Sequence, residues 1–80
     1  MKNYLVEQSN LSANGSEESW KVAEYNNLRD ALEFANSIKE DMKGIHKLPH
    51  GCLQTIVSQY NREDDNYTTL QVYEHHYSSR

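Results

Sequence analysis

Apolar side chains recur at spacings of three and four from residue 28 to residue 42, which is typical of a helix with one buried face. The stripe consists of Leu28, Ala31, Leu32, Ala35, Ile38 and Met42, with Phe34 at its edge. Asn27 stands just before it and Asp30 three positions later, a variant of the capping box. Gly44 suits the left-handed position that ends a helix. The pattern predicts an amphipathic helix over residues 28–43.

Segments rich in β-branched and aromatic residues flank this helix and predict strands. They cover residues 3–8, 20–25, 53–60 and 67–74. Residues 9–19 are polar and poor in core material, so we expect a long mobile loop there. Residues 61–66 are dense in turn formers and predict a hairpin connection. We expect a single small domain over residues 1–80, an α+β fold of order β-β-α-β-β in which a four-stranded antiparallel sheet carries one amphipathic helix on one face.

Alternation along the last strand predicts which side chains face the helix, because successive side chains of a strand point to opposite faces. Leu70 and Val72 are expected to face the helix, which leaves the tyrosines of the strand on an uncovered face. Tyrosine is enriched at interfaces, since its ring can be buried while its hydroxyl stays hydrogen-bonded. The predicted partner-binding residues are Tyr60, Tyr67, Tyr73 and Tyr77, with the acidic turn residues Glu63, Asp64 and Asp65. An ordinary half-solvated sheet face, stabilised by cross-strand pairs, is the alternative.

Composition narrows the classes of partner and compartment. A single cysteine, Cys52, excludes an intrachain disulfide and fits a reducing compartment such as the cytoplasm. We find no signal peptide and no membrane span, so a cytoplasmic protein without a membrane partner is expected. The net charge is −4, and the 8 basic residues are scattered along the chain. Nucleic-acid binders usually cluster their cations, so nucleic acid is a disfavoured partner.

The groups that could support chemistry lack the spacing that chemistry requires. His46, His50 and Cys52 lie close together in sequence, and His75 and His76 are near the C-terminus, but no recognised zinc pattern is present. The acidic turn at residues 63–65 is contiguous and has no central glycine, unlike a calcium loop. Nor is there a nucleophile motif or a phosphate-binding glycine loop. We therefore expect no metal, no cofactor and no enzymatic activity.

The segment from Trp20 to Ala35, WKVAEYNNLRDALEFA, runs from a strand into a helix with the motif Leu-x-x-Ala-Leu-x-x-Ala. Together with the predicted element order, it resembles the build of small phage and mobile-element proteins of the anti-CRISPR inhibitor type. The resemblance spans most of the chain at the level of architecture and assigns no functional residues. It implies a stoichiometric inhibitor that docks on a host defence complex.

Three hypotheses for the function follow. The first is a non-catalytic protein-binding module that acts as such an inhibitor. The second is binding of single-stranded nucleic acid, with Tyr60, Tyr67 and Tyr73 stacking on bases. The third is a small homodimeric structural or regulatory module that self-associates through the sheet face.

Overall fold

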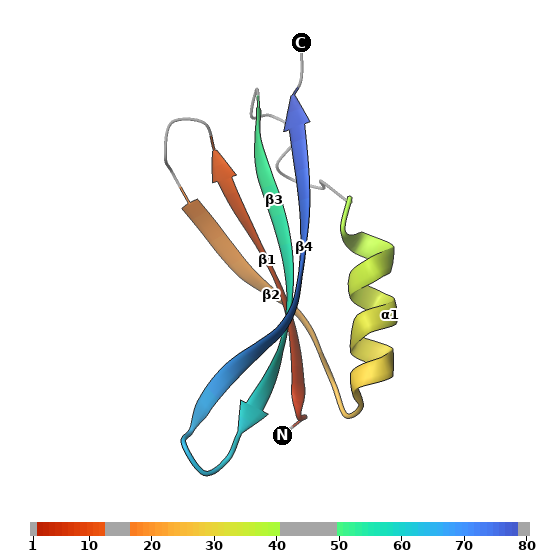
Figure 1. Cartoon of the computed structure of the whole chain (residues 1–80), viewed down its shortest axis with the longest axis vertical. Helices are drawn as coiled ribbons and strands as arrows, with labels where there is room; N and C mark the ends of the chain where they lie inside the picture. Colours follow the sequence, from red (N-terminus) through yellow and green to blue (C-terminus); the bar gives the residue numbers. More distant parts are fainter. Residues whose placement is uncertain (1, 13–16, 41–49, 79–80) are drawn as a thin grey trace.

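A computed structural model of the chain describes residues 2–12, 17–40 and 50–78. The elements are β1 (Tyr4–Ser12), β2 (Glu17–Tyr25), α1 (Leu28–Ile38), β3 (His50–Asn61) and β4 (Asn66–Ser78). The predicted α+β class and the order β-β-α-β-β are confirmed (Figure 1). Every strand is longer than its sequence pattern predicts. None of the helices in the described ranges has the length and apolar run needed to cross a membrane.

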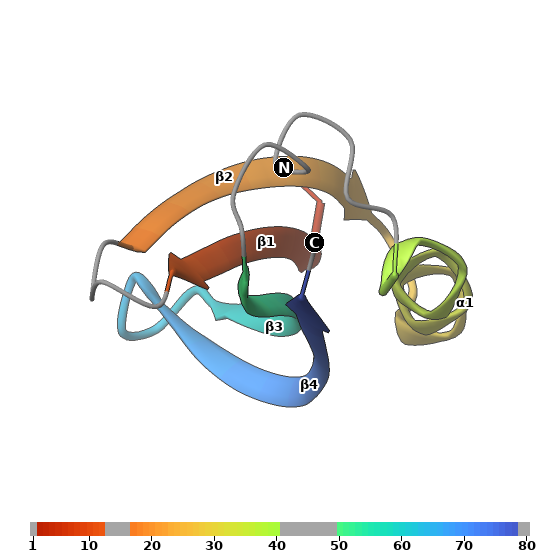
Figure 2. The same ribbon diagram turned by 90° about the horizontal axis from the view of Figure 1, so that it is seen from above.

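The four strands form one antiparallel sheet in the order β2-β1-β3-β4. Each outer strand is joined in a hairpin to an inner one, and the two hairpins meet along the ladder between β1 and β3. In the view from above, the sheet is strongly curved and α1 lies beside it (Figure 2). At ~1.5 Å per residue, α1 is about 16 Å long, whereas the molecule extends 45 Å. The helix therefore covers only part of the sheet.

The start of α1 follows the predicted cap. Asn27 accepts a hydrogen bond through Oδ1 from the Asp30 backbone N–H at 2.9 Å, and its Nδ2 donates to the Asp30 carboxylate at 2.9 Å. The helix ends at Ile38 instead of residue 43. Met42, predicted to extend the apolar stripe, and Gly44, predicted to end the helix, lie outside the described residues.

The core lies between α1 and the two central strands. Ala31 and Ala35 are fully buried against Val6 of β1 and Val57 of β3. Alanine lets the helix approach the sheet closely, and larger side chains surround this contact. The partly buried residues that pack against it are Tyr4, Val22, Tyr25, Leu28, Leu32, Phe34, Ile38 and Tyr73.

Most of the segment predicted as a loop, residues 9–19, belongs to strands, and residues 13–16 lie outside the described residues. Residues 9–12 belong to β1 and residues 17–19 to β2. β1 is an inner strand, and its polar side chains Gln8, Ser9 and Asn10 are buried. Gln8 donates through Nε2 to the Ile38 carbonyl at 3.2 Å and to the Thr55 hydroxyl at 3.3 Å, and Ser9 donates to Gln54 Oε1 at 3.3 Å. The ladder and these bonds satisfy the polar groups that made the segment resemble a loop.

A β-bulge in β4 corrects the predicted orientation of that strand. Val57 pairs with Gln71 but the next residue, Ser58, pairs with Thr69, so Leu70 is an extra residue. One extra residue reverses the alternation beyond it. Tyr73 consequently packs against the core beside α1, where Lys39 Nζ lies 5.5 Å from its ring centroid, and Val72 is exposed. The prediction that Val72 faces the helix and Tyr73 faces away is therefore wrong. Leu70, also predicted to face the helix, is the unpaired bulge residue and is 39% exposed.

Candidate functional site

The sheet face that α1 leaves uncovered, which we call the open face, is the first candidate surface. Val6 packs against α1, so its neighbours Leu5 and Glu7 point to the other side of the sheet. Cross-strand partners share a face, and the register therefore extends the assignment to the other strands. The open face also includes Ser9, Leu11, Glu17, Ser19, Lys21, Glu24, Cys52, Gln54, Ile56, Ser58, Tyr60, Tyr67, Thr69, Val72, Glu74 and His76.

The charged side chains of the open face are mostly acidic. Its carboxylates are Glu7, Glu17, Glu24 and Glu74. Lys21 is the lysine of the open face, and its Nζ lies 3.7 Å from Glu24 Oε1. A hollow in the face is lined by Glu7 and Glu17 together with neutral side chains. Complementary charge steers association, so this face suits a positively charged partner better than the phosphates of a nucleic acid.

The two outer strands differ in how their edges are protected. β2 carries four charged residues among nine, Glu17, Glu18, Lys21 and Glu24. β4 has thirteen residues, of which Glu74 is the one Asp, Glu, Lys or Arg, and it contains no proline. Charged residues and proline are the usual means by which an edge strand avoids pairing with another chain. β4 is therefore the edge better suited to a partner.

Apolar side chains are exposed along the same outer strand. Tyr67, Leu70 and Val72 are 46%, 39% and 39% exposed, and we call these three the β4 strip. Leu11 of β1, 47% exposed, is the other large apolar residue in this class among the described residues. Three of the four thus lie on the strand with the unprotected edge. Exposed apolar residues next to unpaired backbone groups are the features of a strand that accepts a partner.

The tyrosines predicted to bind a partner are divided by the fold. Tyr60 and Tyr67 are cross-strand partners with ring centroids 5.3 Å apart, and Tyr67 is exposed as predicted. Tyr73 lies on the helix side, as described above. Tyr77 belongs to β4, but the position of its side chain lies outside the described part of the chain. The three rings of the nucleic-acid hypothesis therefore do not share one face.

The predicted acidic residues lie at the tip of the β3–β4 hairpin, which extends away from α1 (Figure 1). Glu63 and Asp64 are exposed there. Asp65 adopts a left-handed φ of 48°, which Asp tolerates in turns. The Tyr60 hydroxyl donates to Asp65 Oδ1 at 2.6 Å. This hydrogen bond, followed by desolvation and the negative charge of Asp65, raises the pKa of Tyr60 above its usual value.

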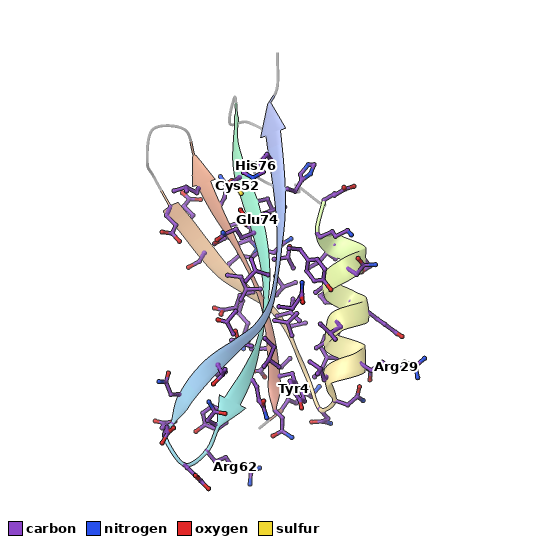
Figure 3. All side chains as sticks on the ribbon, viewed as in Figure 1. Tyr4, Arg29, Cys52, Arg62, Glu74 and His76 are labelled. Carbon is purple, nitrogen blue, oxygen red and sulfur yellow. The ribbon has the colours of Figure 1, made fainter. Side chains whose placement is uncertain are left out.

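Toward the opposite end of the sheet, Cys52, Glu74 and His76 come together on the open face (Figure 3). Cys52 Sγ lies 3.6 Å from Glu74 Oε2 and 3.9 Å from His76 Nε2, and the latter two atoms are 3.8 Å apart. Cys52 is buried, whereas the other two side chains are exposed to solvent. Desolvation, followed by the hydrogen bond to Glu74, raises the pKa of the Cys52 thiol. An unliganded Cys52 is therefore a poor nucleophile at neutral pH.

The sequence analysis missed this cluster, because it grouped Cys52 with His46 and His50. His46 and the side chain of His50 lie outside the described part of the chain. The signal that could have identified the cluster is Glu-x-His at positions 74 and 76, since residues two apart on a strand share a face. The register that adds Cys52 cannot be read from local sequence.

Comparison of the chain with protein-family models, with curated proteins and with solved structures finds no match. The arguments about function therefore depend on the fold, the open face, the outer strand and the ligand cluster themselves.

Proposed function

We propose that this protein is a non-catalytic protein-binding module that docks through the outer edge of β4. The observation that carries the proposal is the contrast between the two edges: β2 is charged, whereas β4 combines thirteen residues and one glutamate with the β4 strip. An extended segment of a partner can add to such an edge through main-chain hydrogen bonds. Apolar contacts with Tyr67, Leu70 and Val72 then supply affinity and specificity.

The occupant that we propose is a positively charged host protein. Four glutamates and one lysine on the open face favour such a partner by charge complementarity. The architecture-level resemblance to anti-CRISPR inhibitors supports the finer proposal that the partner belongs to a defence complex, which the bound chain would block. Complexes that handle nucleic acid present basic surfaces, and this agrees with the charge of the open face.

Site-specific photo-crosslinking in cells that carry the gene tests the docking surface. We expect a photoreactive residue at position 72 to give a discrete adduct with one host protein. The same residue at position 36, exposed on the outer side of α1, is the matched control and should give none. An adduct with the mass of two chains would instead favour the homodimer, and equal adducts from both positions would contradict the proposal.

A phage interference assay tests the inhibitor proposal. Expression of the chain in a host with an active defence system should restore plaque formation. Leu70→Asp should abolish this effect while leaving the circular dichroism spectrum unchanged, because it places a charge in the strip but not in the core. Asn36→Asp, which adds the same charge on exposed α1 surface, should retain the effect. A specific adduct without restored plaques would leave the binding module standing and reject its role as an inhibitor.

A further inference from the structure

Three different metal-ligating side chains meet at one point of the open face. They supply a thiol sulfur, a carboxylate oxygen and an imidazole nitrogen, with pairwise separations of 3.6, 3.9 and 3.8 Å. These separations matter because one ion can bind three atoms at once only if the atoms lie within about twice the metal–ligand bond length of one another.

The dimensions of the triangle fit zinc. The point equidistant from the three atoms within their own plane lies about 2.2 Å from each, close to the ~2.0–2.3 Å of zinc–ligand bonds. An ion with a fourth ligand lies outside this plane, so the three ligand atoms must move slightly closer together. In a tetrahedral zinc site, bonds of these lengths place neighbouring ligand atoms about 3.3–3.6 Å apart. Movements of a few tenths of an ångström would complete the geometry. Sulfur and imidazole ligands also favour zinc over magnesium or calcium, which prefer oxygen.

The fold places the ligands through two specific features. Cys52 and His76 are cross-strand partners on β3 and β4, and Glu74 is the partner of the adjacent open-face residue, Gln54. The bulge at Leu70 determines the phase of β4 beyond it. Without that extra residue, Glu74 and His76 would point toward the helix side, away from Cys52. The same bulge that turns Tyr73 into the core therefore assembles the cluster.

We propose that Cys52, Glu74 and His76 bind one Zn²⁺ ion through Sγ, Oε2 and Nε2. The thiol loses its proton on coordination, and the fourth coordination position faces the uncovered side of the sheet, where water can occupy it. His76 and Glu74 are 76% and 53% exposed, so the ion can enter from solvent. Bound zinc would tie the outer strand β4 to the inner strand β3. The proposal rests on the cluster geometry and is independent of the proposed docking function.

Titration of the reduced, intact chain with Co²⁺ as a spectroscopic substitute tests the site. We expect one equivalent of Co²⁺ to produce the thiolate-to-cobalt absorption and the visible bands of a tetrahedral ion, and Zn²⁺ to displace both. Equimolar Zn²⁺ should also raise the midpoint of thermal unfolding, since a ligand that binds the folded state stabilises it. Absence of the thiolate band under reducing conditions would overturn the proposal.

Variants separate this site from other ligands in the chain. Cys52→Ser should remove the thiolate band, and His76→Gln should weaken binding at least ~100-fold, because the loss of a ligand exceeds the effect of an outer-shell change. His76 is exposed, so its replacement leaves the fold intact even if Cys52→Ser disturbs packing. His75→Gln is the matched control, since His75 points to the other face of β4 and should bind as the native chain does. Equal loss with His75→Gln, or unchanged affinity with His76→Gln, would place the metal elsewhere and reject the site.

Discussion

At the scale of single residues, buried polar side chains in the middle of the sheet connect its strands and the helix through hydrogen bonds. Gln8, Ser9, Asn10, Thr55 and Ser58 are all buried. A buried polar group is tolerated when it is hydrogen-bonded and costly when it is not. Gln8 bridges β1 to the last residue of α1 and to Thr55 of β3. It therefore connects the sheet to the C-terminal end of the helix.

Gln8→Ala tests this connection. The change leaves the buried Thr55 hydroxyl and the partly buried Ile38 carbonyl without the donor that they share, and an unsatisfied buried group costs about 1–3 kcal/mol. We expect the free energy of unfolding, measured by urea denaturation, to fall by about 1–3 kcal/mol. Gln71→Ala is the control, because Gln71 is exposed and donates to the carbonyl of the next residue. A change within about 0.5 kcal/mol for both variants would show that Gln8 is not structural.

At the scale of elements, the bulge at Leu70 decides what β4 presents on each face. Tyr73→Ala removes a ring that packs against the core and lies under Lys39. We expect it to lower the free energy of unfolding by about 1–3 kcal/mol. Val72→Ala, on the exposed side, should change stability by less than about 0.5 kcal/mol. Thermal unfolding of both variants checks the phase of the strand, and the reverse ranking would mean that the alternation has no bulge.

The elements also show what the sequence can predict and what it cannot. The cap at Asn27, the stripe that contains Ala31 and Ala35, and the order of the elements follow from local patterns, and the structure confirms them. β4 has its bulge at Leu70, and β2 has another at Val22, where Val6 pairs with Ala23 and Glu7 with Lys21. Each bulge is defined by the register of a strand against its hairpin neighbour, so alternation within one strand cannot reveal it. The candidate metal ligands depend on that same register and were missed for the same reason. Residues 9–12 were misassigned because hydrogen bonds to both neighbouring strands satisfy their polar groups, and local composition does not report those neighbours.

At the scale of the whole molecule, two hairpins and one helix share a single core. Val6 comes from the first hairpin, Val57 from the second, and α1 closes over both. A small antiparallel unit is marginal by itself in water. Neither hairpin can bury an apolar face without the other, so the domain should fold as one cooperative unit.

A chain that ends at residue 49 tests this cooperativity. It retains β1, β2 and α1 but loses Val57 and the ladder between β1 and β3. We expect the fragment to show no cooperative thermal transition and no slowly exchanging amides in β1, whereas the full chain shows both. Protected β1 amides in the fragment, measured by hydrogen exchange, would mean that the first hairpin and the helix are stable without the second.

The inner position of β1 also matters while the protein is being made. β1 leaves the ribosome well before β3, so the edge of β1 that pairs with β3 stays unpaired while the nascent chain grows. An unpaired strand edge with apolar residues would be prone to aggregation. Gln8, Ser9 and Asn10 make this part of β1 hydrophilic, so we expect them to lower the tendency of the unfinished chain to aggregate.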